Sequence, residues 1–354
     1  MDQSIGRVRS LDTLRGLAAL SVCWFHFVGN TLIGHGWLAA SGKHGFVGVY
    51  VFFVVSGFVI PLALQRESYR IKYYGTFLLK RFARIYPAYL ASVAISFGFL
   101  VLYGIYRDQP RVEIDSESLL LHLVFLNEFF DKPWLNSIYW TLVIEVQFYL
   151  SLGLLFPLIV SSRRINRLIA FTTLALPVLL FSSPTMMFSN AFLLLMGIAT
   201  FQLFVGIIKR LEYSVLLSIF TVCCCLSLSW LAALAGVVTV LAINLMKQGN
   251  ALFDSVGKIS YSLYLLHGSI GSFALYLLLE YVVGDSQFEK AFAVLCAVGF
   301  SIAVAAVSYS LIEKPAMQYG GSLRYQPPAD DQVTDAQALM NLPLVEATLN
   351  AEDY

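Results

Sequence analysis

The chain has 354 residues, of which 58% are hydrophobic and only 13% are charged, and its mean hydropathy is +0.74. This composition excludes an ordinary soluble globular protein and predicts an all-helical, polytopic membrane protein. The formal net charge of +1 argues by itself neither for nor against a charged partner, and no nucleic-acid partner is expected. The five cysteines include the run 223–225 but no Cys-x-x-Cys spacing, so the sequence predicts no zinc or other metal site and no disulfide framework.

Residues 11–33 form the first predicted membrane-spanning helix, and they carry Arg15 and His26. Ionisable side chains are costly at membrane depth, so they usually mark a functional site. Eleven positions separate the two residues, which places them on one helix face about 16 Å apart along the axis. We therefore expect Arg15 and His26 to line a single cavity.

Nine further apolar segments have lengths that suit membrane spans. The ten predicted helices cover residues 11–33, 46–64, 86–106, 138–160, 168–181, 186–208, 213–230, 231–246, 259–281 and 288–312. Residues 119–126 are apolar but too short to span, so we expect a re-entrant or interfacial segment there. Ten spans put both termini on one side of the membrane. If that side is the cytoplasm, 18 of the 23 Lys and Arg residues are cytoplasmic, as the positive-inside rule requires.

The chain divides into a predicted membrane domain, residues 1–315, and an acidic cytoplasmic tail, residues 316–354. The tail carries six acidic residues and one base, Arg324. We expect it to be mostly disordered, with a short helix at about residues 336–349. Charged residues interrupt the first helix, so we expect no cleaved signal peptide and a first helix that stays in the mature protein.

The predicted orientation assigns a depth to each polar residue of the spans. The first helix rises toward the outside and the fourth returns, which places His26 and Glu145 at similar depth in the outer half of the membrane. Ser56 and His267 come near the membrane centre. A carboxylate beside an imidazole stabilises the imidazolium, so we expect His26 and Glu145 together to remove a proton from a hydroxyl group.

Arginines are predicted on the cytoplasmic side, at Arg15, Arg81 and Arg84. Guanidinium groups bind phosphates through paired, charge-assisted hydrogen bonds. The order of these groups across the membrane therefore predicts a phosphorylated donor that enters from the cytoplasm. The acceptor hydroxyl arrives from outside, and the two substrates meet at His26.

Some of these residues also have purely structural interpretations. Ser56 and Gly57 suit a small-residue contact between helices. Arg81 and Arg84 suit determinants of membrane topology. His267 is equally compatible with a structural hydrogen bond across helices and with the site. No role is expected for the remaining histidines, which are His35, His44 and His122.

Six sequence motifs occur in order along the chain. They are Arg15 and His26 with ten residues between them, FFVVSG at 52–57, Arg81-x-x-Arg84 followed by Ile85-Tyr86-Pro87, WTLVIEVQFYL at 140–150, SYSLYLLH at 260–267 and LIEKP at 311–315. Together they resemble acyltransferase family 3, a family of integral-membrane O-acyltransferases that are best known for acetylating bacterial surface polysaccharides. The resemblance extends from about Arg9 to Pro315.

The resemblance implies a ten-helix domain in the bacterial inner membrane. Such a protein takes an acyl group, usually acetyl, from cytoplasmic acyl-coenzyme A and delivers it to a hydroxyl of an envelope carbohydrate or glycolipid. It implies that His26 is catalytic, that Glu145 belongs to the core motif, and that Arg15, Arg81 and Arg84 contact the donor. Acyl-coenzyme A is thus a substrate, no tightly bound cofactor is expected, and the other expected partner is membrane lipid.

Some members of this family carry a C-terminal hydrolase-like domain. This chain carries only the acidic tail there, so the membrane domain is expected to act alone or with a separate partner. Two mechanisms remain open: His26 acts as a general base during direct transfer, or it is itself acylated and then deacylated by the acceptor.

A different class of function also remains open, a proton-coupled transporter or lipid-linked sugar flippase. In that case His26 and Glu145 relay protons, and the basic residues recruit an anionic substrate. The sequence contains no sign of the inverted repeats or paired broken helices that are typical of many transporters.

Overall fold

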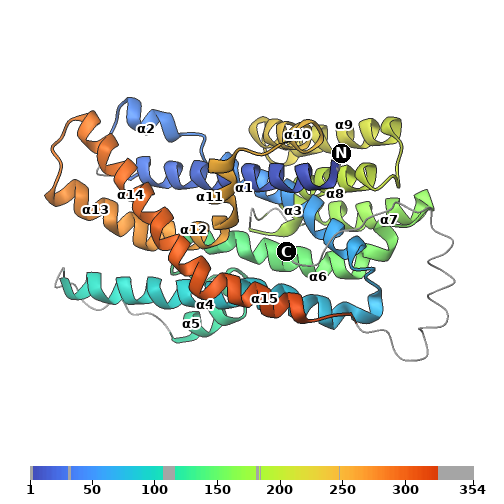
Figure 1. Cartoon of the computed structure of the whole chain (residues 1–354), viewed down its shortest axis with the longest axis horizontal. Coiled ribbons are helices and arrows are strands. Elements are labelled where there is room, and N and C mark those ends of the chain that lie inside the picture. Colours follow the sequence, from blue (N-terminus) through green and yellow to red (C-terminus); the bar gives the residue numbers. More distant parts are fainter. Residues whose placement is uncertain are drawn as a thin grey trace.

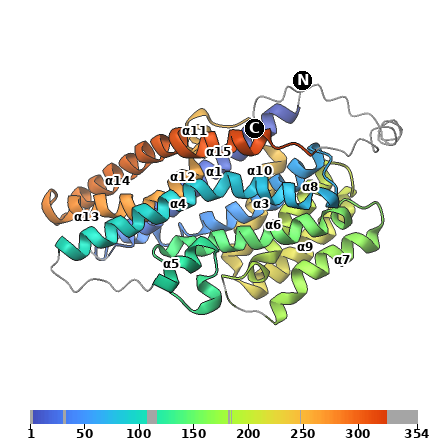
Figure 2. The ribbon, with the colours of Figure 1, turned by 90° about the horizontal axis from the view of Figure 1, so that it is seen from below.

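The structure is a computed structural model that describes residues 3–30, 33–106, 116–180, 183, 185–246 and 248–325. Within these residues every regular element is a helix, which confirms the predicted all-helical class for this part of the chain. Most of the long helices run side by side along the longest dimension of the molecule (Figures 1 and 2).

The helices follow the order of the predicted spans. The α-helices are α1 (Gln3–Val28), α2 (Trp37–Gly42), α3 (Val47–Arg66), α4 (Tyr74–Tyr106), α5 (Ser116–Leu123), α6 (Trp140–Ile159), α7 (Arg164–Ala175), α8 (Ala191–Phe204), α9 (Arg210–Ser227), α10 (Trp230–Leu245), α11 (Ala251–Lys258), α12 (Ser260–Leu266), α13 (Ser272–Tyr281), α14 (Gln287–Ser308) and α15 (Lys314–Ser322). The 3-10 turns are η1 (Ile71–Tyr73), η2 (Asn127–Phe130), η3 (Ser137–Tyr139), η4 (Leu176–Leu179) and η5 (Met187–Asn190). Two π-helical turns are η6 (His267–Gly271) and η7 (Tyr309–Glu313).

Seven helical stretches in the described part of the chain are long and apolar enough to cross a membrane. They are Trp37–Arg66, Ile71–Leu102, Ser137–Ile159, Met187–Phe204, Arg210–Ser227, Ser260–Tyr281 and Gln287–Ser322. The helix α10 is apolar but shorter. The helix α1 is not among the seven, and its apolar sequence is interrupted by Asp12, Arg15 and His26. A multi-pass membrane protein is therefore confirmed, whereas the number ten stays a prediction.

At three places the structure adds to or differs from the sequence prediction. The helix α4 begins at Tyr74 and continues through Pro87, so Arg81 and Arg84 lie on one face of a helix instead of in a loop. The last helix continues through η7 into α15, so residues 316–322 are helical and the tail begins later than predicted. A short helix, α5, occupies part of the segment expected to be re-entrant or interfacial. The helix predicted at residues 336–349 lies outside the described residues.

The bundle has two distinct ends. In Figure 1 the connection between α3 and α4 and the end of α15 lie at one end, on the right. The helix α2 and the connection between α13 and α14 lie at the opposite end, on the left. The first end carries Arg66, Arg70 and Lys72 in the α3–α4 region, which agrees with a cytoplasmic end. The assignment of this end to the cytoplasm stays a prediction.

Glycines allow α3 and α8 to approach until their backbones touch. A Cβ atom added at Gly57 would lie 2.2 Å from the backbone oxygen of Leu194, and one added at Gly197 would lie 2.2 Å from the backbone oxygen of Val54. Small residues allow this close packing where lipid gives no hydrophobic driving force between helices. Gly57 therefore makes the small-residue contact that the sequence suggested, and Ser56 beside it remains available to a cavity.

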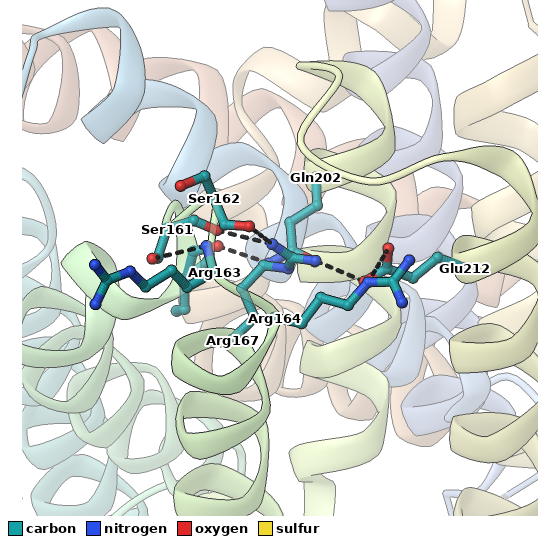
Figure 3. Close-up of polar contacts among 8 residues, drawn as sticks. Ser161, Ser162, Arg163, Arg164, Arg167, Gln202 and Glu212 are labelled. Carbon is teal, nitrogen blue, oxygen red and sulfur yellow. Dashed lines mark hydrogen bonds and ion pairs between the residues drawn. The ribbon is translucent and has the colours of Figure 1, made fainter.

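The buried side chain of Arg167 fastens α6, α7 and α9 together (Figure 3). Its Nη1 donates to the carbonyl oxygens of Ser161 (2.9 Å) and Ser162 (3.0 Å), and its Nη2 donates to Glu212 (2.7 Å). Arg164 also lies 3.6 Å from Glu212, but its side chain is 78% exposed, whereas that of Arg167 is 4% exposed. The buried arginine thus satisfies the carbonyl groups at the end of α6 and joins them to α9.

Candidate active site

A cavity of about 120 Å³ lies among α1, α3, α4, α6, α8 and α12. It is lined by five of the seven site residues that the sequence predicted. These five are Arg15 of α1, Ser56 of α3, Arg81 and Arg84 of α4, and Glu145 of α6. The residues are distant in the sequence, so only the packing of the helices brings them together. We call this space the arginine cavity.

The wall of the arginine cavity is made almost entirely of the sequence motifs. Only Val49, Val59, Ile60 and Leu194 among its lining residues fall outside them. The motifs that contain Arg81 and Glu145 supply the charged groups, and FFVVSG supplies an apolar side. The motif SYSLYLLH adds Ser260, Tyr261 and Tyr264. Segments that are scattered over most of the chain therefore enclose one volume.

The charge around the arginine cavity is predominantly positive. Three guanidinium groups line it, against a single lining carboxylate. In the described part of the chain, Arg15, Arg81 and Arg84 make no ion pair within 4 Å. The guanidinium of Arg81 lies over the rings of Phe77 (5.6 Å) and Tyr149 (5.9 Å), and its buried Nε has no hydrogen-bond partner. Unpaired, partly desolvated arginines of this kind suit an anionic ligand.

Glu145 belongs to this cavity and is bound by Tyr149, whose hydroxyl donates to Oε1 one helical turn along α6. The sequence predicted that Glu145 lies beside His26; in the structure Glu145 lines the cavity and His26 does not, and the two side chains make no hydrogen bond. Depth along two helices fixes the height of each residue but not the direction in which its side chain points. Tyr149 is the residue that this reasoning missed, although its spacing of four from Glu145 was a readable signal.

His26 meets His267 instead. The ring centroids of the two histidines are 5.2 Å apart, and the ring of Phe25 lies 5.1 Å from that of His26. His267 is fully buried, and its Nδ1 lies 2.7 Å from the carbonyl oxygen of Tyr264 and 3.2 Å from that of Leu263. His267 therefore has both of the features that the sequence left open, a structural hydrogen bond and a place beside His26.

Neither histidine lines the arginine cavity, so the prediction that Arg15 and His26 share one cavity is wrong for this conformation. Tyr264 forms the boundary, because its ring lines the cavity and also packs 5.8 Å from the ring of His267. Its hydroxyl accepts a hydrogen bond from Thr141 (2.9 Å). Phe52 packs edge-on against Tyr264 at 6.0 Å and also lines the cavity. The cavity and the histidines are thus separated by one aromatic layer.

A second buried carboxylate, Glu313, was not predicted as a site residue. It is 1% exposed and accepts hydrogen bonds from the backbone N–H (3.2 Å) and the hydroxyl (2.7 Å) of Ser262. It ends the π-helical turn η7, where the following Pro315 has no N–H to donate to the preceding turn. Glu313 also lies within electrostatic range of Arg15 and Arg84, so it adds negative charge behind the arginine cavity.

The other histidines lie away from these groups. His44 is exposed. His122 is buried, its Nδ1 is 2.7 Å from the carbonyl oxygen of Ser118, and its Nε2 accepts from the backbone N–H of Leu135 (3.0 Å). Burial lowers the pKa of His122, and the bond to Ser118 opposes this shift. His122 therefore serves the structure of the segment between α4 and α6.

No group of three or more His, Cys, Asp or Glu side chains in the described residues is placed to hold a metal ion. The cysteines are free thiols.

Comparison with known proteins identifies the family of this chain. Residues 8–310 match the sequence model of a family described as an acyltransferase domain. BcsY of Komagataeibacter xylinus, named as a membrane-bound transacylase, is 30% identical over 154 residues, which are 40% of this chain and 36% of BcsY. Peptidoglycan O-acetyltransferase OatA of Listeria monocytogenes is 28% identical over 157 residues, 40% of this chain and 23% of OatA. O-acetyltransferase OatA of Staphylococcus aureus is 28% identical over 167 residues, 43% of this chain and 24% of that protein.

The matched regions thus cover little more than a third of these relatives at most. No solved structure matches the chain.

Proposed function

Because this chain belongs to the acyltransferase family whose sequence model matches residues 8–310, we propose that it is a membrane O-acyltransferase with acyl-coenzyme A as donor. The transferred group is acetyl, and the acceptor is a hydroxyl of a carbohydrate or glycolipid of the bacterial cell envelope. The observation that carries this proposal is the arginine cavity, where the family's motifs converge around three unpaired guanidinium groups. The protein resides in the inner membrane with both termini in the cytoplasm.

Arg15, Arg81 and Arg84 bind the donor in this proposal. Coenzyme A carries several phosphate oxygens, which guanidinium groups bind through charge-assisted hydrogen bonds. The cavity, at about 120 Å³, is smaller than sites that hold a whole drug-sized ligand, which measure roughly 300–1,000 Å³. It therefore holds one part of the donor, and the rest extends toward the end of the bundle that carries the α3–α4 connection.

His26 performs the chemistry. In direct transfer it accepts the proton of the acceptor hydroxyl while the hydroxyl oxygen attacks the thioester carbonyl. The new C–O bond replaces the C–S bond, and the proton passes from His26 to the leaving thiolate. An acyl-histidine route reaches the same products in two steps. Glu145 acts at the same site from the cavity side, where it orients Tyr149 and balances the arginines, and Ser56 lines the donor's path.

Transfer of radiolabelled acetyl groups from acetyl-coenzyme A by purified protein in vesicles tests the role of His26. We expect His26→Ala to lose transfer, because the proton acceptor is gone, while donor binding persists. His44→Ala removes an exposed histidine that does not line the arginine cavity and is the matched control with normal transfer. A transfer rate for His26→Ala within a few-fold of the wild type would overturn the proposed centre.

Donor binding separates an acyltransferase from the alternative, a proton-coupled transporter or lipid-linked sugar flippase. We expect saturable binding of acetyl-coenzyme A that is strongly weakened in Arg84→Ala, because one guanidinium of the cavity is removed. Arg70→Ala removes an exposed arginine of the α3–α4 connection and should bind normally. No saturable binding in the wild type, or equal loss in both variants, would contradict the donor site and favour the transporter.

A further inference from the structure

His267 presents an unusual lone pair to the protein interior. Its Nδ1 faces the carbonyl oxygens of Tyr264 and Leu263, and carbonyl oxygens only accept hydrogen bonds. The ring proton therefore resides on Nδ1, and Nε2 is an acceptor. This Nε2 is fully buried and has no hydrogen-bond partner. Buried polar atoms are nearly always paired, so an orphaned acceptor in a folded protein calls for an explanation.

The local backbone holds the orphaned atom beside α1. His267 begins the π-helical turn η6, a widened turn of a kind that occurs frequently at functional sites. Gly271 at the end of this turn allows Phe27 of α1 to pack closely, since an added Cβ would lie 2.6 Å from the Phe27 ring. The packing of α1 against η6 therefore sets the distance of 5.2 Å between the rings of His26 and His267.

His26 has an unused donor at the same place. In the described part of the chain its side chain makes no hydrogen bond. The rings of Phe25 and Phe27 near the pair offer no acceptor, and the hydroxyl of Tyr264 is engaged with Thr141 and the carbonyl oxygen of Ile138. The structure shows no hydrogen bond between the two rings, but at a centroid distance of 5.2 Å a rotation of the His26 ring can bring one of its nitrogens within hydrogen-bond range of Nε2 of His267.

We propose that His267 is a positioning residue, whose buried Nε2 accepts the N–H of His26 and so turns the other nitrogen of His26 toward the substrates. This inference rests on the proposed role of His26. When the N–H of His26 points toward His267, the other ring nitrogen of His26 carries the lone pair. This nitrogen then faces the side from which the acceptor hydroxyl arrives. A neutral histidine thus does here what a carboxylate does for the histidine of a catalytic triad.

His267 neither gains nor loses a proton during the proposed transfer. The hydroxyl proton moves to the free nitrogen of His26 as the C–O bond forms, and it leaves with the thiolate of coenzyme A as the C–S bond breaks. The N–H between His26 and His267 is never transferred. The hydrogen bond strengthens when His26 becomes charged, because bonds to charged groups are stronger than neutral ones.

Two substitutions of the same residue separate positioning from packing. In His267→Asn the amide nitrogen keeps the bond to the Tyr264 carbonyl, but no acceptor reaches the place of Nε2. In His267→Gln the amide oxygen reaches that place and restores the acceptor. We expect His267→Asn to lower kcat by about 10- to 100-fold, the factor that a hydrogen bond to a charged group supplies, with unchanged KM for acetyl-coenzyme A. We expect His267→Gln to recover most of the lost rate.

The controls distinguish failure of this inference from failure of the proposed function. His44→Asn should behave as the wild type in every assay. If His26→Ala is inactive while His267→Asn is fully active, His267 has no positioning role and the proposed centre stands. If His26→Ala is active, the proposed centre fails as well. If both variants of His267 lose the same rate and raise KM together, the residue is structural and the inference is wrong.

Discussion

Replacement of Arg167 by alanine is expected to destabilise the protein far more than the same replacement of its neighbour Arg164. Both arginines pair with Glu212, so the two variants remove the same type of contact from the same carboxylate. They differ in burial, since the side chain of Arg167 is 4% exposed and that of Arg164 is 78% exposed. The two variants therefore compare a buried arginine, which also donates to two carbonyl oxygens, with an exposed arginine on the same carboxylate.

The structure gives the size of the expected effect. Arg167→Ala breaks a buried ion pair and leaves the carbonyl groups of Ser161 and Ser162 without their donor (Figure 3). Loss of one partner of a buried pair costs about 3–5 kcal/mol. We expect about 3 kcal/mol, because Arg164 remains to compensate Glu212 in part. Arg164→Ala removes an exposed contact of the kind that contributes about 0–1 kcal/mol.

Reversible unfolding in mixed micelles, followed by circular dichroism as the denaturing detergent is titrated, measures the free energy of unfolding of each variant. Specific transfer activity per folded molecule should be equal in the two variants, because the cluster lies outside the arginine cavity. Equal destabilisation by Arg167→Ala and Arg164→Ala would refute the reasoning, since burial would then not decide the stability of the pair.

Three other perturbations test separate parts of the molecule. Gly197→Ala places a Cβ 2.2 Å from the carbonyl oxygen of Val54, so α3 and α8 must move apart. We expect the same detergent titration to show a free energy of unfolding that is lower by about 1–3 kcal/mol. An unchanged free energy of unfolding would mean that these helices are loosely packed. Tyr149→Phe frees the carboxylate of Glu145 to pair with an arginine of the cavity, so calorimetry should register weaker binding of acetyl-coenzyme A, and normal binding would speak against competition for the guanidinium groups. Burial lowers the pKa of His122, whereas a histidine in an unfolded chain titrates near 6.5, so on acidification the unfolded segment binds a proton before the folded one does. The stability of the folded segment therefore falls as the pH drops below about 6.5. Hydrogen exchange of α5 should therefore accelerate, beyond the intrinsic pH effect, between about pH 7.5 and about pH 5.5, and His122→Gln should remove this dependence.

The all-helical, multi-pass class was predictable from the sequence because hydropathy over long windows reports directly on burial in lipid, whereas the number of spans stays a prediction. The residue at which α4 begins was not predictable from the sequence. Pro87 resembles the proline of a first helical turn, and the basic residues before it resemble a cytoplasmic loop. In the structure the helix passes through Pro87, and Arg81 and Arg84 use their spacing of three to face one cavity.

Which residues lie at the candidate site was easier to predict from the sequence than which side chains each of them contacts. Depth along a helix follows from counting residues, which is why Arg15, Ser56 and Glu145 were expected inside the membrane. The direction of a side chain around the helix axis depends on how helices rotate against each other, and no local pattern contains this rotation. The pairing of His26 with His267, and the place of Glu313 behind the arginines, therefore emerged only from the tertiary structure.

The aromatic layer of Tyr264 and Phe52 bears on whether protons can leak across the membrane through this protein. A protein with ionisable groups at several depths offers protons a path across a membrane whose potential drives each charge with about 2.3 kcal/mol per 100 mV. Tyr264, which lines the arginine cavity and packs on His267, and Phe52, which packs on Tyr264, interrupt such a path. A packed aromatic layer of this kind lets a membrane protein carry ionisable groups at several depths and still block the passage of protons.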